Sequence, residues 1–377
     1  MKKKRKNVGQ FVAMLGFVAV GMACGLLIAA YMDSLVPSDK GAGVYLLFGG
    51  FLILAMYAVI YLQIIWHEAG HLVCGLLSGY RFCSFRIGNL IWVKENETLH
   101  LRRLSIAGTG GQCLMLPPEP EDGRIPVMLY NLGGPLANLL TGVLAFGGYL
   151  LLKEQALAAL LLLMTAIIGF AFAAINGIPM RMNGVDNDGY NAFSLGKNPQ
   201  AIRSFWIQLK MQELIAGGTR LSKMPKEWFR IPSDEEMKNS MTAVMGVFAC
   251  NRLMDEQRFD EADEQMQHLL GIESGITGLH KSLMICDQIY CELIGKNREE
   301  RLEQMLNKEQ KKFMKAMKKF PSVLRTRYAY ALLAKKDVAE AAEVEQQFER
   351  CAKKYPYPSE VQGERELMQI AKSRTGE

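Results

Sequence analysis

The sequence lacks several features that would assign it to common protein classes. Its eight cysteines include no C-x-x-C pair. We therefore expect reduced, packed thiols rather than a disulfide framework or a cysteine-ligated zinc site. The net charge is only +6 over 377 residues, and the basic residues of the second half are interspersed with acidic ones, so nucleic-acid binding has little support. No segment resembles a PDZ or a CBS domain.

Charge is scarce in the first half of the chain. Up to about residue 180 the sequence is mostly apolar, and from about residue 197 it is dense in Lys, Arg, Glu and Gln. Segments of about 20 apolar residues can cross a bilayer, and four segments are long enough: about 10–32, 44–78, 126–152 and 156–178. The predicted fold is mainly α, with a polytopic membrane helix bundle followed by a soluble helical domain.

The ends of the chain are predicted to be cytoplasmic. The basic run at 2–6 precedes an apolar stretch of full membrane length without a clear cleavage site, which favours a retained transmembrane helix over a signal peptide. Loops rich and poor in Lys and Arg then alternate along the chain, and basic loops stay in the cytoplasm. We expect an integral, multi-pass protein of a bacterial cell membrane.

Composition divides the chain into four regions. An N-terminal transmembrane helix (1–35) precedes a membrane core (36–216), a polar linker (217–237) and a soluble helical domain (238–377). Strand-forming residues around a polar turn at 94–97 predict a β-hairpin within about 82–106 of the core. This hairpin is either a plain surface connection or an exposed strand edge that can pair with an extended peptide.

The soluble domain shows a weak repeat. Its helix–turn–helix patterns recur at about 40-residue intervals, around 251–262, 291–300 and 331–341. The tetratricopeptide repeat has a period of about 34 residues. The domain therefore resembles a degenerate tetratricopeptide array, with a generic helical bundle as the alternative. Such an array would offer a surface to a cytoplasmic protein partner.

The second apolar segment ends in an H-E-x-x-H motif. His67 and His71 are four residues apart, so on a helix they share a face and can bind one metal ion. Glu68 stands beside them, where it can act on a metal-activated water. The preceding stretch 44–66 contains no charged residue, which places the motif on a membrane helix.

Two further polar features occur near the other spans. Asn138 follows Gly134 and Pro135 in the third span, and a polar side chain at this depth is expected to face the bundle interior. Asp186 and Asp188 follow the fourth span. Either carboxylate can complete a two-histidine zinc site, although an aspartate at such a position also commonly caps a helix.

These motifs together resemble the site-2 protease family of intramembrane zinc metalloproteases, peptidase family M50. That family combines H-E-x-x-H on one core helix with an N-x-x-P…D-G pattern on a third, and many members carry G-P-x-x-N on the helix between. The corresponding residues in this sequence are 67–71, Asn176 to Pro179 with Asp188 and Gly189, and 134–138. The resemblance covers roughly residues 44–195.

The resemblance implies a zinc site. His67, His71 and Asp188 would bind the metal, and Glu68 would be the general base. Asn138 and Asn176 would support the site or contact substrate.

One spacing departs from the family pattern. The step from Pro179 to the Asp-Gly pair is longer than in many members, which leaves Asp186 as a rival ligand. We favour Asp188 because Gly189 follows it.

The function expected from these features is intramembrane zinc-dependent proteolysis. The substrates would be transmembrane or signal-peptide segments within the lipid bilayer, cut in the manner of regulated intramembrane proteolysis. The alternative is a catalytically inactive, membrane-anchored scaffold whose helical repeats bind a partner. A transporter has little support, because four spans without an internal repeat are few for that function.

Overall fold

The computed structural model describes residues 8–37, 39–95, 98–106, 109–121, 123–182, 185–195 and 198–376. The basic run at 2–6, the turn residues 96–97, Gly108 of the following loop and the pair 183–184 lie outside these ranges. The chain forms two compact units. Unit 1 contains residues 1–81 and 120–198, and unit 2 contains residues 82–119 and 199–377.

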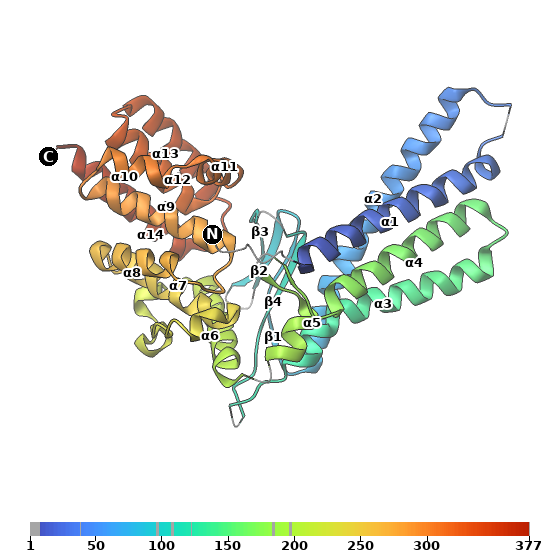
Figure 1. The fold of residues 1–377 in the computed structure, drawn as a ribbon, viewed down its shortest axis with the longest axis horizontal. Helices are drawn as coiled ribbons and strands as arrows, with labels where there is room; N and C mark the ends of the chain where they lie inside the picture. Colours follow the sequence, from blue (N-terminus) through green and yellow to red (C-terminus); the bar gives the residue numbers. More distant parts are fainter. Residues whose placement is uncertain are drawn as a thin grey trace. The chain divides into compact units, whose positions relative to one another are not determined.

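Unit 1 contains the four predicted membrane helices (Figure 1). These are α1 (Val8–Leu35), α2 (Ala42–Leu77), α3 (Val127–Leu152) and α4 (Ala156–Gly177). Each is long and apolar enough to cross a membrane, which confirms the predicted spans. Many of their apolar side chains face outward, such as Leu47 at 79% and Leu151 at 84% exposure. Surfaces of this kind suit a lipid environment.

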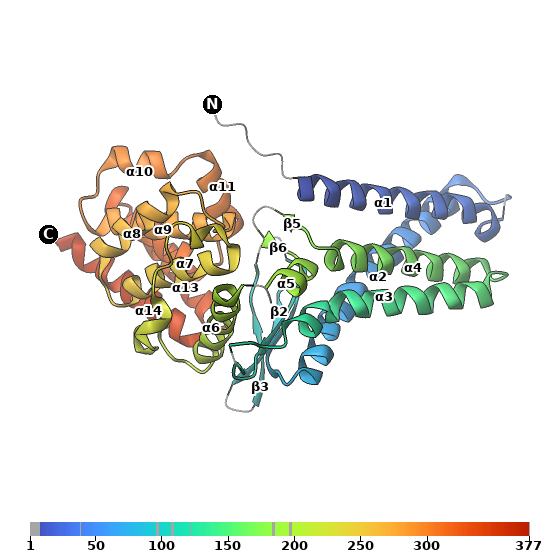
Figure 2. The same ribbon diagram turned by 60° about the horizontal axis from the view of Figure 1, so that its bottom comes forward.

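Helix α3 packs against both α2 and α4, and α1 packs against α4 (Figure 2). The buried centre of this packing includes Leu52, Leu160 and Met164. Helix α2 has 36 residues and at 1.5 Å per residue is about 54 Å long. This exceeds the hydrocarbon thickness of about 30 Å, so α2 continues beyond it, as the sequence predicted.

The predicted hairpin forms part of a larger sheet in unit 2. The sheet contains β1 (Arg81–Ile87), β2 (Leu90–Glu95), β3 (Thr98–Arg103) and β4 (Gly111–Leu116), in the order β3-β2-β1-β4. Strand β2 is antiparallel to both β1 and β3, and the β2–β3 pair is the hairpin read from the sequence. The edges are therefore β3 and β4, so any pairing with an extended peptide is restricted to those two strands.

The sheet packs with the C-terminal helices. Ile91, Val93 and Leu104 are buried in the same apolar core as those helices. The backbone N–H of Arg103 also donates a hydrogen bond of 2.9 Å to the carbonyl of Lys354. Sequence order had grouped the hairpin with the membrane core, but its apolar face is buried in unit 2.

The segment expected as a linker is folded onto the same core. Helix α6 (Pro199–Ala216) is followed by the short 3₁₀ helices η2 (Leu221–Lys223), η3 (Lys226–Phe229) and η4 (Glu236–Lys238). Met224, Phe229 and Met237 from this stretch are buried in the core of unit 2. Its scattered apolar residues fix it in place although its overall composition is polar.

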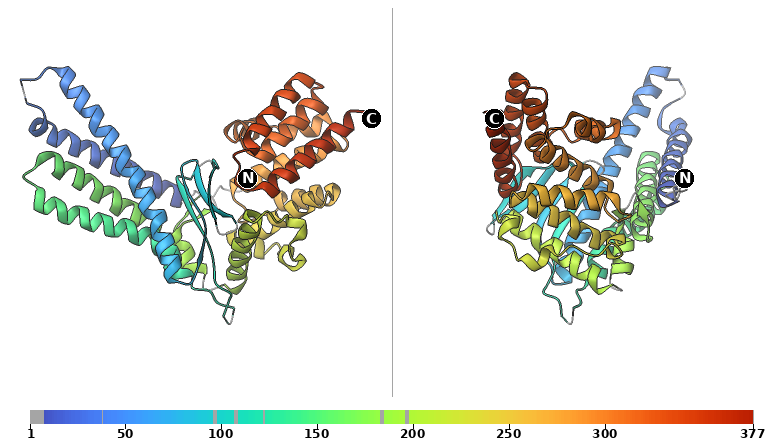
Figure 3. Two further views of the ribbon diagram at one scale, coloured as in Figure 1. Left: turned by 180° about the vertical axis from the view of Figure 1, so that it is seen from behind. Right: turned by 60° about the vertical axis from the view of Figure 1, so that its left-hand side comes forward.

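The C-terminal region is a series of short helices (Figure 3), coloured from yellow to red. They are α7 (Ser240–Asp255), α8 (Phe259–Gly271), α9 (Gly278–Ile294), α10 (Glu299–Met305), α11 (Lys308–Ala316), α12 (Pro321–Ala329) with the π-helical η5 (Tyr330–Ala334), α13 (Val338–Ala352), α14 (Pro358–Ser373) and η6 (Arg374–Gly376). Gln257, Asn297 and Lys336 have positive φ angles of 59°, 48° and 56°. These residues lie at the three predicted turns. The assignment to the tetratricopeptide class stays a prediction.

Candidate metal centre

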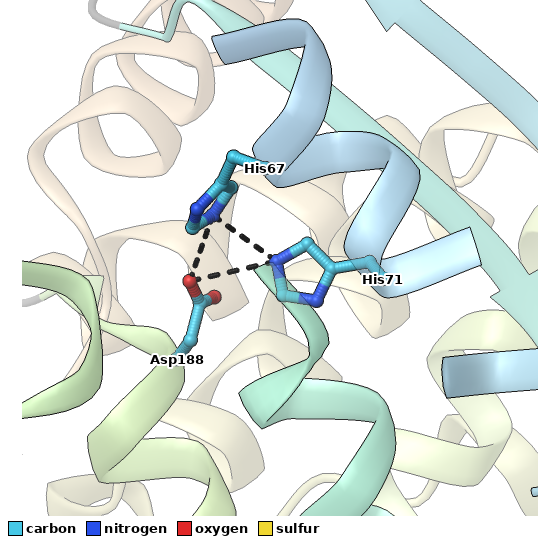
Figure 4. Close-up of side chains that lie close together, drawn as sticks. All are labelled: His67, His71 and Asp188. Atoms are coloured by element: carbon cyan, nitrogen blue, oxygen red, sulfur yellow. Dashed lines mark hydrogen bonds and ion pairs between the residues drawn. The ribbon is translucent and has the colours of Figure 1, made fainter. Parts of the chain in front are cut away.

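The two motif histidines lie on one face of α2 near its C-terminal end. Both are buried, with 9% exposure for His67 and 7% for His71, and their Nε2 atoms are 3.2 Å apart. The spacing of four residues on a helix produces this pairing without help from the rest of the fold. Figure 4 shows both rings directed toward a common point.

Asp188 brings a carboxylate to the same point. It is the first residue of α5 (Asp188–Ser194), and its Oδ2 atom lies 3.0 Å from Nε2 of His67 and 3.5 Å from Nε2 of His71. Asp188 therefore supplies a carboxylate oxygen to the point that both imidazoles face.

The spacing of the three donor atoms fits a tetrahedral metal ion. Zinc binds imidazole nitrogen and carboxylate oxygen at about 2.1 Å, so two ligand atoms at tetrahedral angles are about 3.4 Å apart. The observed separations are 3.0, 3.2 and 3.5 Å. Two histidines and one carboxylate are also the protein ligands of several catalytic zinc sites, which leave a fourth position for water or substrate.

The outer nitrogen of each histidine bonds to α3. His67 Nδ1 lies 2.7 Å from Oδ1 of Asn138, and His71 Nδ1 lies 2.8 Å from the backbone carbonyl of Tyr130. The Asn138 amide nitrogen donates in turn to the backbone carbonyl of Gln63 at 2.9 Å and to its side-chain oxygen at 2.7 Å. Carbonyl oxygens can only accept hydrogen bonds, so Asn138 presents its own oxygen to His67.

This network determines which ring nitrogen carries the proton. Both Nδ1 atoms face acceptors and must donate to them, so in the neutral rings both Nε2 atoms carry lone pairs. Those lone pairs point toward each other and toward the Asp188 carboxylate. A histidine that donates its other ring N–H to an oxygen is typical of metal sites, because the bond fixes the tautomer and the ring orientation.

Glycines make room for the cluster. A Cβ atom on Gly134 would lie 2.6 Å from Nε2 of both His67 and His71, so the side-chain-free backbone of α3 passes directly beside the donor atoms. Gly70 and Gly133 allow the approach itself, since a Cβ on Gly70 would lie 2.2 Å from the Gly133 oxygen. Small residues are common where membrane helices approach closely.

Asn187 positions Asp188, and the sequence analysis missed it. Its Nδ2 atom donates to the carbonyls of Ile175 and Ile178, while its Oδ1 accepts from the backbone N–H of Met180 and Tyr190. These bonds join the end of α4 to the start of α5. The alternative of a helix-capping aspartate is wrong, because Asn187 is the N-cap and Asp188 is left to face the histidines.

Asp186 has a different partner. It lies in β6 (Val185–Asp186), which pairs with β5 (Arg181–Met182), and its Oδ1 atom accepts a 2.6 Å hydrogen bond from Nε of Arg181. The β5–β6 hairpin takes up the additional residues between Pro179 and the Asp-Gly pair.

The two asparagines chosen from the sequence differ in their contacts. Asn138 is fully buried and contacts His67, whereas the Asn176 side chain donates to the Phe172 carbonyl of its own helix. Gln63 and Tyr130 were not predicted. A signal for Gln63 was present, since it is a polar residue in an uncharged span, one helical turn before His67. Glu68 is 8% exposed, next to His67 on the same helix.

Comparison with known families matches residues 55–328 to peptidase family M50. The matched region contains all the residues of the candidate metal cluster. No curated protein and no solved structure matches the chain.

Proposed function

The chain belongs to peptidase family M50, whose members are intramembrane metalloproteases, and we propose that it is a zinc endopeptidase of the site-2 protease type. It hydrolyses peptide bonds in or near transmembrane segments of membrane proteins or signal peptides. We place the protein in a bacterial cell membrane with both termini in the cytoplasm.

The observation that carries this proposal is the arrangement of His67, His71 and Asp188. Their donor atoms come within 4.8 Å of one another, and the remaining ring nitrogens are held by Asn138 and Tyr130. We assign the three residues as metal ligands and Asn138 as a residue that orients His67. When bound, zinc supplies Lewis acidity that polarises a peptide carbonyl and acidifies a water molecule.

Glu68 performs the proton transfer in this proposal. Its carboxylate accepts a proton from the attacking water and delivers it to the amide nitrogen that leaves. The residue is buried on α2 beside His67, so bulk water has little access to the proton. The substrate has to unwind locally, because a peptide bond inside a helix is hydrogen-bonded and shielded.

The proposal is tested by separating metal binding from proton transfer. Purified full-length protein in detergent is incubated with a peptide that contains a transmembrane segment, and cleavage and bound zinc are measured together. We expect one zinc per chain, loss of cleavage by a strong chelator, and restoration by added zinc. Glu68→Gln should retain zinc but cleave about 10²–10⁴ times more slowly. Unchanged cleavage by Glu68→Gln and in chelator would disprove the proposal.

The structure also bears on the scaffold alternative. The long step between Pro179 and Asp188 motivated that reading, but the β5–β6 hairpin and Asn187 return Asp188 to the histidines. Zinc content distinguishes the two, since a scaffold need not bind stoichiometric metal. We propose that the C-terminal helical domain recruits a cytoplasmic partner or substrate by its surface.

A further inference from the structure

Most arginines in the C-terminal helices have acidic partners. Arg325 bonds to Asp287 and Glu364, and Arg220, which precedes these helices, bonds to Asp255 and Glu366. The same holds for Arg252, Arg258, Arg298, Arg301 and Arg365. In this domain an arginine without a carboxylate is therefore an exception that needs an explanation.

Such exceptions gather around one pocket of unit 2. The pocket has a volume of about 720 Å³, within the range of small-molecule sites. Six cationic side chains line it, and no Asp or Glu does: Arg103, Lys318, Lys319, Arg327, Arg350 and Lys354. Within the described ranges, none of the six has an ion pair with a carboxylate.

The contacts of two of these arginines leave their charge uncompensated. Arg327 donates to the side-chain oxygen of Gln347 at 3.3 Å, and Arg350 donates to the backbone carbonyl of Gln346 at 3.2 Å. Both acceptors are neutral. Several cations within one concavity raise the local electrostatic potential and attract anions. The pocket therefore favours a ligand with several negative charges.

The pocket is built from two parts of unit 2 that are joined directly. The hydrogen bond from the Arg103 N–H to the Lys354 carbonyl connects β3 to the end of α13. Leu104 and Leu324 belong to the same buried core and also line the pocket, together with Phe320. The cations therefore surround an apolar floor that is fixed by packing.

We propose that this pocket binds a ligand that carries two or more phosphate groups. Guanidinium groups bind phosphate oxygens with charge-assisted, often bidentate hydrogen bonds. Six positive charges are more than a ligand with one carboxylate neutralises, so a ligand with several phosphate charges fits better. The apolar floor formed by Phe320 and Leu324 accommodates a less polar part of the ligand. This chemistry fits both a nucleotide and the head group of an anionic phospholipid.

The test measures binding, so it is independent of peptide cleavage. Full-length protein in zwitterionic detergent is titrated with inorganic tripolyphosphate, with ATP and with a short-chain cardiolipin, which is a lipid with two phosphates. The test variant combines Lys319→Gln with Arg350→Gln, both exposed side chains of the pocket. The matched control combines Lys308→Gln with Lys372→Gln, which are also exposed but lie outside the pocket.

We expect tripolyphosphate to bind in a salt-sensitive manner, with an affinity lowered about tenfold or more in the test variant and unchanged in the control. Tighter binding of ATP than of cardiolipin supports the proposal with a nucleotide as ligand, and the reverse order supports it with a lipid head group. Absence of binding, or equal losses in the two variants, overturns the proposal. Binding of hexaglutamate as tight as that of tripolyphosphate also overturns it, in favour of an acidic peptide.

Discussion

Asn138 accepts a 2.7 Å hydrogen bond from Nδ1 of His67 and donates its own amide to the Gln63 carbonyl. Gln63 lies one turn before His67 on α2. The single Asn138 side chain of α3 therefore bonds to two residues of α2. The bond orients the His67 ring and leaves its Nε2 lone pair toward Asp188. An asparagine on α3 thereby orients a histidine of the candidate metal site on α2.

Asn138→Ala should weaken zinc binding about 10–100-fold, because removal of such a partner loosens the ring and its tautomer. The measurement is competition with a chromogenic chelator in detergent. Asn176→Ala is the control, since that side chain bonds only within its own helix in the contacts described above, and its zinc affinity should match wild type. Equal losses in both variants would contradict the positioning role of Asn138.

Gly134→Ala should abolish zinc binding. The new methyl group would lie 2.6 Å from the donor nitrogens of both histidines, where it clashes with the rings and occupies space beside the metal. Gly147→Ala on the same helix adds a methyl group that meets no atom within 4 Å and should bind zinc normally. Zinc content after gel filtration checks both variants. A Gly134→Ala protein with full zinc content would show that the cluster is not the metal site.

Asp188→Asn should weaken zinc binding, whereas Asp186→Asn should not. The first removes the carboxylate 3.0 Å from His67 and should lower zinc affinity by at least about tenfold, since a neutral amide replaces an anionic ligand. The second replaces the carboxylate that accepts from Arg181, away from the two histidines, and should leave affinity unchanged. Zinc loss in Asp186→Asn alone would reverse our choice between the two aspartates.

Glu360 should make the stability of unit 2 depend on pH. Burial raises the pKa of Glu360 to about 7, with a further contribution from Glu364, although the Tyr355 hydroxyl donates to it and lowers the pKa. The folded state thus binds a proton more tightly than the unfolded state, whose pKa is near 4.5. The contribution of Glu360 to the free energy of unfolding is fully present below pH 4.5. It is lost as the pH rises to 7 and above, which lowers the stability by up to ~3 kcal/mol.

The urea midpoint from tryptophan fluorescence measures this effect, because Trp92, Trp206 and Trp228 all lie in unit 2. Glu360→Gln lacks this titrating carboxyl, so its midpoint should fall less than that of the wild type across this pH window. A wild-type midpoint that rises between pH 5 and pH 8 relative to the variant would contradict the assignment.

The structural features that depend only on residues close together in the sequence could be predicted. A membrane span requires about 20 apolar residues in sequence, so hydropathy was sufficient to locate α1 to α4. The pairing of His67 with His71 follows from helical geometry alone. The β2–β3 hairpin is also local, since its two strands follow each other along the chain.

Features that depend on distant segments were not predictable in the same way. The choice between Asp186 and Asp188 depends on Arg181, on the β5–β6 hairpin and on the cap made by Asn187. Polar composition suggested a linker at 217–237, but single residues such as Met237 are buried in the core. The average composition of a segment does not reveal which of its side chains are buried against other apolar residues.

The sequence by itself determined the four apolar helices and the two histidines of the candidate metal cluster, because both follow from short-range periodicity and from the length of a span. Family resemblance had favoured Asp188 and Asn138, but only the tertiary structure brought the Asp188 carboxylate to 3.0 Å from Nε2 of His67 and Asn138 Oδ1 to 2.7 Å from its Nδ1. It also brought Arg103 beside Lys354, far apart in sequence, at one basic pocket. Basic residues that alternate with acidic ones along the chain come together at this pocket, because burial of the apolar residues between them fixes where each segment packs.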